Sequence, residues 1–313
     1  MNNRENLQVV FGSGPLGLSV VDELVRRGQA VRVVNRSGKA DVPAGVEVVA
    51  ADVYDRLAAR NAAKGAAVVY QCAQPPYHKW VELFPALQGN ILDAAAEAGA
   101  RLVVGGNLYV YGAVEGAIHE GLPYNAHTRK GKIRAQVDEA VLAAHRSGKV
   151  QAVIGRGADF FGPRVMGSTA GERMFLPALR GKAASVVGNP DLPHTHTYIE
   201  DFGRALVVLG ERDEAPGQDW IVPNAETVST REMVKLIFEA AGKPLKISAM
   251  GKWMMAFGGL FIPEARESVE MMYEFERPFI ADSSKFTQTF GLRATPLPEA
   301  VQKTVAWYRQ HGR

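Results

Sequence analysis

The sequence predicts an α/β fold built on a doubly wound parallel sheet, and three features of the chain support this prediction. From residue 7 to about residue 155, short β-branched runs alternate with longer amphipathic segments. The short runs are nearly continuous in Val and Ile, as expected for strands that helices cover on both faces. A glycine-rich turn also joins the first run to the first helical segment.

The predicted strands follow one another at the spacing of β-α-β units. In chain order they are Leu7 to Phe11, Val31 to Asn35, Val46 to Ala50, Ala67 to Cys72, Leu102 to Gly105 and Gln151 to Gly155. Helices are predicted between them, including the segments LGLSVVDELVRRG and FPALQGNILDAAAEAGA. After GRGADFFGP the regular alternation ends. There we expect a smaller C-terminal α/β lobe, with a helix from Glu172 to Gly181, a strand at ASVVG and a turn entering a helix at HTHTYIEDFGRALVVLG.

Composition limits the classes of function. The chain has 313 residues, 47% of them hydrophobic, and a formal charge of only +3. This indicates a soluble globular protein without the strongly basic surface that binds nucleic acid. No segment holds the roughly 20 apolar residues that cross a bilayer, so no membrane association is expected. The single cysteine, Cys72, lies in an apolar run, which predicts a packed thiol and a reducing, cytoplasmic location.

Gly12, Gly14 and Gly17 form a G-x-G-x-x-G motif between the first strand and the first helix. A tight turn, the close approach of a pyrophosphate and close helix–strand packing each require a residue without a side chain. The helix N-terminus then faces the phosphates. The motif predicts a dinucleotide site on a Rossmann-type domain. The expected cofactor contacts are Gly12, Ser13, Gly14, Pro15, Leu16, Gly17, Asn35, Arg36, Ser37, Asp52, Val53 and Ala73.

The end of the second predicted strand favours NADP over NAD. An NAD site typically offers a carboxylate to the ribose 2′-hydroxyl at this place, whereas this chain has the uncharged Asn35 followed by Arg36 and Ser37. A guanidinium pairs well with a 2′-phosphate. Asp52 is expected near the adenine, and a solvent-exposed helix cap is its alternative role.

Several segments, taken in order, resemble the landmarks of the extended short-chain dehydrogenases/reductases, the NAD-dependent epimerase/dehydratase group. They are GSGPLG, AADVYD, GNILDAAAEAGARLVVGGNLYVYG, KGKIRAQVDEAVL, GRGADFFGP, TYIEDFGRAL and FGLRATPLPEAVQKTVAWYRQ. The resemblance covers residues 7 to about 310. It implies an NADP-binding Rossmann domain, expected at 1–165 and 197–225, and a substrate-binding lobe at 166–196 and 226–313. Homodimers are usual in the resembled family.

The resembled family usually acts through a Ser or Thr, a Tyr and a Lys, and this chain keeps one of these three landmarks. Carried over residue by residue, the serine position is Asn107, the tyrosine position is Thr128 and the lysine position is Lys132. A threonine hydroxyl is a far weaker acid than a phenol of pKa about 10. The resemblance therefore implies that Asn107 donates a hydrogen bond to a substrate oxygen and that Lys132 holds the cofactor ribose. The proton donor is lost or relocated.

Tyr109 is the first candidate for a relocated proton donor. It shares a face with Asn107 if the strand continues that far. A buried aromatic side chain with a hydrogen-bonded hydroxyl is the alternative role for Tyr109. The other titratable residues of this region are Tyr111, His119, Tyr124 and His127.

The stretch HTRKGKIRAQVDEA begins a predicted helix and carries four basic residues. Arg129 and Lys130 are interpreted as solvated charges at the start of the helix, and Arg134 and Asp138 as an exposed i,i+4 pair. This interpretation leaves Lys132 as the basic residue expected to reach the cofactor.

The sequence favours an NADP-dependent oxidoreductase that transfers a hydride between the cofactor and a small carbonyl or alcohol. Two alternatives stay open, a catalytically inactive NADP-binding redox sensor and a sugar-nucleotide epimerase or dehydratase. No metal is expected, because His194 and His196 lack a carboxylate or cysteine cluster at ligand spacing. A group of apolar residues that we call the apolar wall consists of Trp253, Met254, Phe257 and Met272. If this wall faced the site, it would favour an apolar or aromatic substrate. Core packing is its alternative role.

Overall fold

The computed structural model describes residues 6–251 and 269–312, which form two compact units. The first unit holds the described residues up to Val110 together with Arg129–Arg156 and Phe202–Trp220. The second holds Tyr111–Thr128, Gly157–Asp201 and the described residues from Ile221 onward. Each unit thus combines segments that are far apart in the sequence, and the domain boundaries given above stay a prediction.

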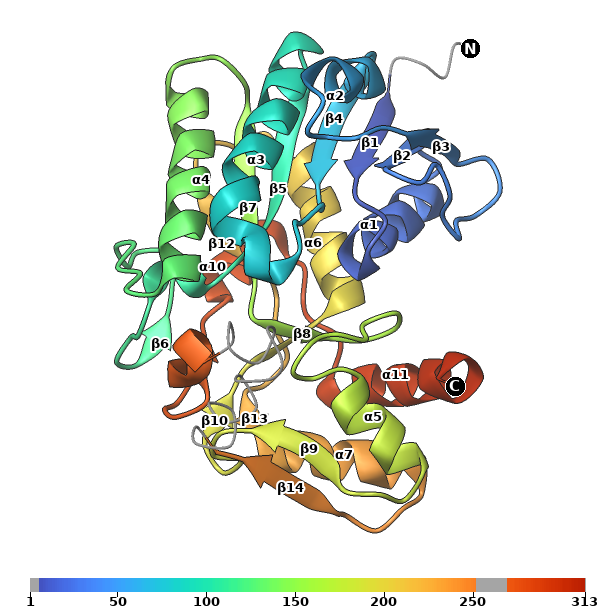
Figure 1. Cartoon of the computed structure of the whole chain (residues 1–313), viewed down its shortest axis with the longest axis vertical. Coiled ribbons are helices and arrows are strands. Elements are labelled where there is room, and N and C mark those ends of the chain that lie inside the picture. The colour runs from blue at the N-terminus through green and yellow to red at the C-terminus, as the bar shows by residue number, and fades with distance from the viewer. Residues whose placement is uncertain (1–5, 252–268, 313) are drawn as a thin grey trace. The chain divides into compact units, whose positions relative to one another are not determined.

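A seven-stranded sheet forms the centre of the first unit and confirms the predicted fold class (Figure 1). The strand order is β12-β7-β5-β4-β1-β2-β3, and the pairs β1–β2, β2–β3, β1–β4 and β4–β5 are parallel. The strands are β1 (Leu7–Phe11), β2 (Val31–Asn35), β3 (Glu47–Ala50), β4 (Ala66–Gln71), β5 (Arg101–Asn107), β7 (Ala152–Gly157) and β12 (Asp219–Ile221). The order reverses between β1 and β4. The carboxyl ends of these strands are therefore the switch point at which open α/β sheets bind ligands.

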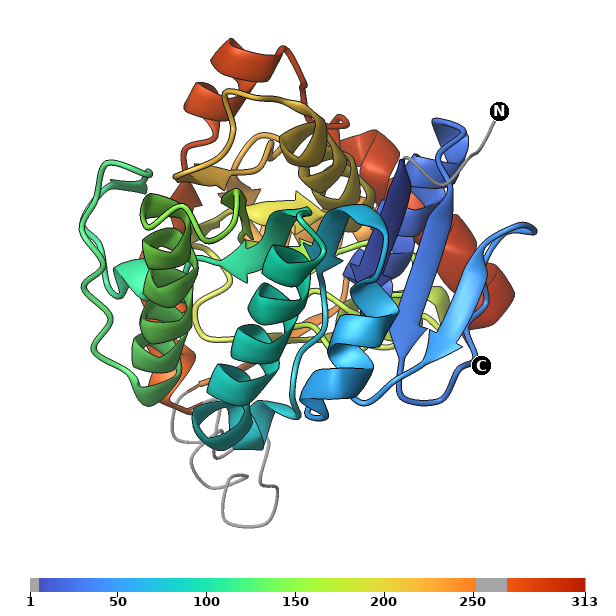
Figure 2. The same cartoon turned by 90° about the horizontal axis from the view of Figure 1, so that it is seen from above.

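Helices cover both faces of this sheet (Figure 2). One face carries α2 (Arg56–Ala63), α3 (Trp80–Glu97) and α4 (Arg129–Arg146), and the other carries α1 (Pro15–Arg26) and α6 (Ile199–Glu211). α1 and α6 pack closely, because a Cβ atom on Gly203 would lie 2.6 Å from the backbone of Ser19. Coverage on both faces explains why consecutive strand residues such as Val9 and Val10 are both fully buried.

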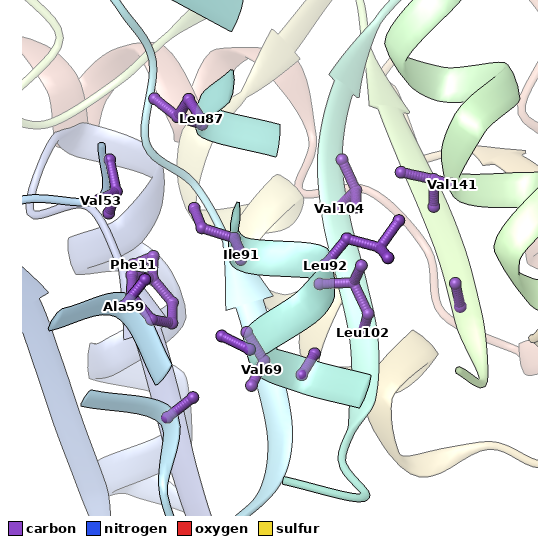
Figure 3. Packing of buried hydrophobic residues seen from close by; sticks show 14 of the residues in the cluster. Phe11, Val53, Ala59, Val69, Leu87, Ile91, Leu92, Leu102, Val104 and Val141 are labelled. Atoms are coloured by element: carbon purple, nitrogen blue, oxygen red, sulfur yellow. The ribbon is translucent and has the colours of Figure 1, made fainter. Parts of the chain in front are cut away.

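Figure 3 shows the core between the sheet and the helices α2, α3 and α4. Side chains of β1, β4 and β5, such as Phe11, Val69 and Val104, meet those of α3, such as Leu87 and Ile91, and all of them are buried. Burial of one Val, Leu, Ile or Phe side chain stabilises a fold by about 1.5–3 kcal/mol. This cluster therefore fixes the strands whose carboxyl ends carry the candidate site.

The second unit contains small two-stranded sheets and helices packed around a core of its own. The paired strands are β10 (Pro193–His194) with β13 (Val228–Ser229), β8 (Asp159–Phe161) with β11 (His196–Tyr198), β9 (Ala184–Val187) with β14 (Ile247–Met250), and β6 (Ala117–Ile118) with β15 (Ile280–Ala281). The helices are α5 (Glu172–Leu179), α7 (Thr230–Ala241), α10 (Ser284–Phe290) and α11 (Leu297–His311). Phe175 of α5 stacks on Tyr308 of α11 with ring centroids 5.0 Å apart, which joins two helices of this core.

The prediction of a turn before α6 is wrong, because HTHTY forms strands β10 and β11. β11 pairs in parallel with β8, and β10 pairs antiparallel with β13. The partner strands lie more than 30 residues away in the sequence, so the local pattern carries no sign of them. In the part of the chain that the structure describes, no helix is long and apolar enough to cross a membrane.

Candidate functional site

The glycine loop between β1 and α1 excludes side chains at two positions and leaves space at the third. A Cβ atom on Gly12, whose φ is +102°, would lie 2.7 Å from the backbone nitrogen of Ala73. A Cβ atom on Gly17 would lie 2.0 Å from the carbonyl oxygen of Gly12. A Cβ atom on Gly14 would meet nothing within 4 Å. The backbone of Gly14 therefore borders open space in which a ligand can approach it closely.

The first turn of α1 suits an anion in this space. Pro15 begins the helix, Gly14 provides no side-chain cap and the first turn contains no acidic residue. The N–H groups at a helix N-terminus and the helix dipole favour negative charge. Leu16 turns away toward β5, where its Cδ2 atom lies 2.7 Å from the Cβ position of Gly105. Together with the switch point of the sheet, these features fit the pyrophosphate of a dinucleotide.

Asn35, at the end of β2, links this strand to the glycine loop. Its amide nitrogen donates to Ser13 Oγ (2.8 Å) and to the carbonyl oxygen of Lys39 (2.9 Å), and its Oδ1 accepts from the Gly38 N–H (2.8 Å). The turn that follows leaves Arg36 and Ser37 exposed. The end of β2 thus carries an exposed arginine directly after the residue that contacts the glycine loop.

In the loop after β3, Asp52 does not have the helix-cap role that was its alternative prediction. Asp55, and not Asp52, is the N-cap of α2, where its Oδ1 accepts from the backbone N–H groups of Leu57 and Ala58. Asp52 instead accepts from the N–H of Tyr54 at 3.1 Å and is exposed. Burial raises the pKa of the Tyr54 phenol, and the nearby Arg36 guanidinium opposes this rise. The Arg36 guanidinium therefore lies close enough to the loop after β3 to interact with the Tyr54 hydroxyl.

Val53 follows β3, and the half-buried Cys72 and Ala73 follow β4 beside the glycine loop. Val53 is buried, and the backbone of Ala73 limits the space at Gly12. Burial raises the pKa of the Cys72 thiol to about 12, so the thiol stays protonated at neutral pH. This agrees with a packed thiol and not with a nucleophile.

At the carboxyl end of β5, Asn107 and Tyr109 are not arranged as they would be on a continuous strand. β5 ends at Asn107, and Tyr109–Tyr111 form a 3-10 turn, so the two side chains do not share a strand face. The N–H of Tyr109 donates to Asn107 Oδ1 at 3.3 Å. The half-buried ring of Tyr109 lies 6.1 Å from Trp80, whose ring lies 5.0 Å from Tyr77. We call Tyr77, Trp80 and Tyr109 the aromatic cluster.

α4 buries charged residues that were expected in solvent. Lys130 is 1% exposed, and its Nζ lies 4.4 Å from the ring centroid of Tyr77. Arg134 and Asp138 are also buried, with a closest N–O distance of 3.3 Å. The predictions of a solvated Lys130 and of an exposed Arg134–Asp138 pair are therefore wrong. Lys132 is exposed. A spacing of four residues predicts that two side chains share a helix face, but it does not predict whether that face is covered.

A buried charge network lies directly beneath Asn107, and sequence reasoning missed it. Arg156 on β7 donates from Nη1 to Asp138 Oδ2 (2.7 Å) and from Nε to Asp219 Oδ2 (2.6 Å). Its Nη1 also donates to the carbonyl oxygen of Asn107 at 3.0 Å. The available signal was a single arginine within the otherwise uncharged strand AVIGRG. Arg156 therefore fixes the backbone at the end of β5.

The second unit holds the other titratable residues singled out from the sequence. The rings of Tyr111 and Tyr124 are 5.8 Å apart, and those of His127 and Tyr273 are 4.8 Å apart. The Nδ1 atom of His119 accepts from the N–H of Gly121 at 3.2 Å. Thr128, at the tyrosine position of the resembled family, is buried.

A second polar cluster in this unit consists of Asp159, His194, His196 and Glu274. His194 Nε2 lies 3.0 Å from Asp159 Oδ2, and the ring of His194 stacks against Phe275. Burial lowers the pKa of His196 to about 3, with a further decrease from His194. Within the described residues, no group of three or more His, Cys, Asp or Glu side chains is arranged to hold a metal ion.

Glu274 is expected to make the stability of the protein fall as the pH rises. Burial, with the neighbouring Asp159 charge, raises the pKa of Glu274 well above its ordinary value. The contribution of Glu274 is complete below the pKa of an unfolded glutamate and decreases as the pH rises toward the folded pKa. Glu274→Gln should therefore stabilise the protein progressively between pH 5 and 8, measured as the free energy of unfolding in urea. The exposed Glu239→Gln is the control, and a parallel pH dependence of Glu274→Gln and the unsubstituted protein would contradict the prediction.

Of the predicted apolar wall, Met272 lies in the second unit and is buried. Trp253, Met254 and Phe257 fall outside the described residues.

Comparison with known proteins gives a family match and several similar structures. The family model described as the NAD dependent epimerase/dehydratase family matches residues 9–222. Among solved structures, the chain is similar to gox2253, with 21% identity, a TM-score of 0.76 and 99% of each chain covered. It is also similar to a UDP-glucose 4-epimerase from Thermotoga maritima with UDP-glucose, at 16% identity, a TM-score of 0.80 and coverage of 98% of this chain and 100% of that chain.

A third similar structure is DesIV, a dTDP-glucose 4,6-dehydratase from Streptomyces venezuelae with NAD and TYD bound. The identity is 16%, the TM-score is 0.79 and 97% of each chain is covered. No curated protein sequence matches the chain. At these identities the structural likeness shows the fold.

Proposed function

Because the chain belongs to the NAD dependent epimerase/dehydratase family, we propose that it is an NADP(H)-dependent oxidoreductase acting on a small carbonyl or alcohol by hydride transfer. The observation that carries this proposal is the open space at Gly14, between the end of β1 and the start of α1. A bound cofactor would supply the hydride. The chain would hold the pyrophosphate against the glycine loop and the 2′-phosphate against Arg36 and Ser37.

Asn107 is proposed to bind the substrate oxygen. It ends strand β5 of the seven-stranded sheet, and its backbone is fixed by Arg156. A carboxamide N–H can stabilise negative charge that develops on a carbonyl oxygen. The expected result is NADPH oxidation with a panel of small ketones and aldehydes, and a fall of about 100-fold in kcat for Asn107→Ala. Undiminished turnover by Asn107→Ala would contradict this role.

Two other functions can be tested on the same preparation of the protein. The similar structures include sugar-nucleotide enzymes, so conversion of UDP-glucose would favour an epimerase. Tight NADPH binding without turnover of any carbonyl would favour a redox sensor, for which the loss of the family tyrosine at position 128 is the supporting observation. NAD is the alternative cofactor, since the similar DesIV structure has NAD bound.

Arg36 is expected to determine the preference for NADP. A charge-assisted hydrogen bond contributes about 1.5–3 kcal/mol, so Arg36→Ala should raise the Kd of NADPH by about 10- to 100-fold. The Kd of NADH should change by less than about twofold, because its 2′-hydroxyl offers no charge to the guanidinium. Both constants can be measured from the fluorescence of the reduced cofactors. Arg212→Ala, at an exposed arginine of the same unit, is the control, and equal losses for both cofactors would contradict the prediction.

A further inference from the structure

The C-terminal ends of α5, α7 and α11 surround a cavity in the second unit. Its volume is about 380 Å³, which is in the range of sites for small molecules. The three helices share one apolar core, so the fold of this unit alone holds the cavity in place. Part of its lining is apolar and consists of Leu176, Leu179 and Ala241. The proposed function does not use this cavity.

Three cations line the same cavity, one from the end of each helix. Arg180 is the C-cap of α5, and Lys243 directly follows the C-cap of α7. Arg309 belongs to the last turn of α11. Among the described residues, no Asp or Glu lines the cavity. Because a hollow lined by charges of one sign concentrates ligands of the opposite sign, the cavity suits an anion.

The attraction of cations to helix ends explains only part of this positive charge. The C-terminus of a helix carries about half a negative charge, so the three ends together do not neutralise the three lining cations. At the end of α7, Nη2 of Arg309 donates to the carbonyl oxygen of Ala240 at 2.9 Å. At the end of α5, Nζ of Lys246 donates to the carbonyl oxygen of Gly181 at 3.0 Å. These two side chains already serve the helix ends.

Arg180 and Lys243 stay available to a ligand. In the part of the chain that the structure describes, neither side chain makes a hydrogen bond or an ion pair. The Cδ atom of Lys243 lies 3.9 Å from the Cβ position of Gly181, so this side chain extends from the end of α7 toward the end of α5. A guanidinium and an ammonium both bind phosphate oxygens through charge-assisted hydrogen bonds.

We propose that this cavity binds a small phosphate monoester that carries an apolar group. The phosphate lies between Arg180, Lys243 and Arg309, and the apolar group covers the half-buried Leu176 and Leu179. A phosphate monoester carries close to two negative charges at neutral pH, so it suits three cations better than a carboxylate does. The glycine loop belongs to the other unit, and this ligand is neither the substrate nor the cofactor of the proposed function.

Isothermal titration calorimetry with phenyl phosphate tests the proposal. We expect saturable binding with a Kd below about 1 mM, and binding at least about tenfold weaker for inorganic phosphate, benzoate and phenol. Arg180→Ala and Lys243→Ala should each raise the Kd of phenyl phosphate by about tenfold, as expected for loss of a charge-assisted hydrogen bond. Both side chains are exposed, so both variants should fold. Lys235→Ala, at an exposed lysine of α7 outside the cavity, is the matched control and should keep the Kd.

Two further measurements locate the binding and identify its ligand. Gly14→Val should leave the Kd of phenyl phosphate unchanged, and a loss of binding in this variant would place the ligand at the glycine loop and overturn the proposal. Sedimentation with vesicles of phosphatidylcholine and phosphatidic acid is not expected. If the protein sediments with them and Lys243→Ala does not, the cavity belongs to a membrane-binding surface and the proposal is overturned.

The remaining outcomes are equally decisive. The absence of saturable binding at millimolar concentrations, or an unchanged Kd for both Arg180→Ala and Lys243→Ala, would overturn the proposal. Equal affinities for phenyl phosphate and inorganic phosphate would show a general anion site and contradict the role of the apolar lining. None of these measurements needs the cofactor or turnover, so the proposal can fail while the oxidoreductase function holds, and the reverse.

Discussion

Gly14→Val is expected to weaken NADPH binding by about 10- to 100-fold while the cofactor-free protein stays as stable as before. The φ of Gly14 is −76° with extended ψ, which any residue adopts, and its Cβ position meets no protein atom within 4 Å. The valine side chain would occupy the space where a pyrophosphate meets the backbone N–H groups. Loss of one charge-assisted hydrogen bond costs about 1.5–3 kcal/mol, which sets the expected loss of affinity. Fluorescence titration with NADPH and urea denaturation measure the two effects separately.

Gly17→Ala is the matched contrast within the same loop. Its Cβ atom would lie 2.0 Å from the Gly12 carbonyl oxygen, a backbone atom that cannot move aside cheaply. Overpacking of this kind typically costs about 1–3 kcal/mol, so Gly17→Ala should lower the free energy of unfolding even without cofactor. If Gly14→Val binds NADPH as tightly as the unsubstituted protein, the glycine loop is not the pyrophosphate site.

Arg156→Met is expected to destabilise the protein by about 3–5 kcal/mol, the range seen when one member of a buried ion pair is removed. Arg156 is fully buried and bridges the carboxylates of Asp138 and Asp219, so its loss leaves both of these charges without that partner. The free energy of unfolding in urea, followed by circular dichroism, measures the change. Because Nη1 of Arg156 also holds the carbonyl oxygen of Asn107, any folded fraction should show reduced turnover.

Two further variants show whether uncompensated charge causes this loss. Asp219→Asn in the Arg156→Met background removes one of the two carboxylates and should recover part of the stability. Arg231→Met breaks an ion pair with Asp191 in which both partners are exposed, and little change is expected there. Equal stability of Arg156→Met and the unsubstituted protein would show that the network is dispensable.

The sequence predicts the sheet and the glycine loop well because both depend on local patterns. Continuous Val and Ile runs locate β1, β2, β3, β4, β5 and β7 with ends that differ by at most two residues from those observed, whereas β12 was not predicted. Gly17 packs against the backbone of Gly12 within this one βα turn, whereas Gly12 packs against the backbone of Ala73 after β4. The spacing of the three glycines between a strand and a helix is visible in the local sequence, so the loop can be found without knowledge of these contacts.

The charged part of the site could not be predicted in the same way. Whether Lys130, Arg134 and Asp138 face solvent or the sheet depends on how α4 is rotated against Gly106 and Arg156, which come from other strands. The helical period groups these residues correctly but does not show which side is covered. The strands at His194 and His196 depend likewise on partner strands elsewhere in the chain.

The hydrogen bonds of the Asn35 side chain have a consequence for engineering cofactor preference. The usual change toward NAD places an acid at this position, but a carboxylate cannot donate to Ser13 Oγ or to the carbonyl oxygen of Lys39 as the Asn35 amide does. The end of β2 and the shape of the glycine loop are thus linked through one side chain. Under the proposed function, we expect that substitution of Arg36, which is exposed in the turn that follows, alters the preference while the loop keeps its form.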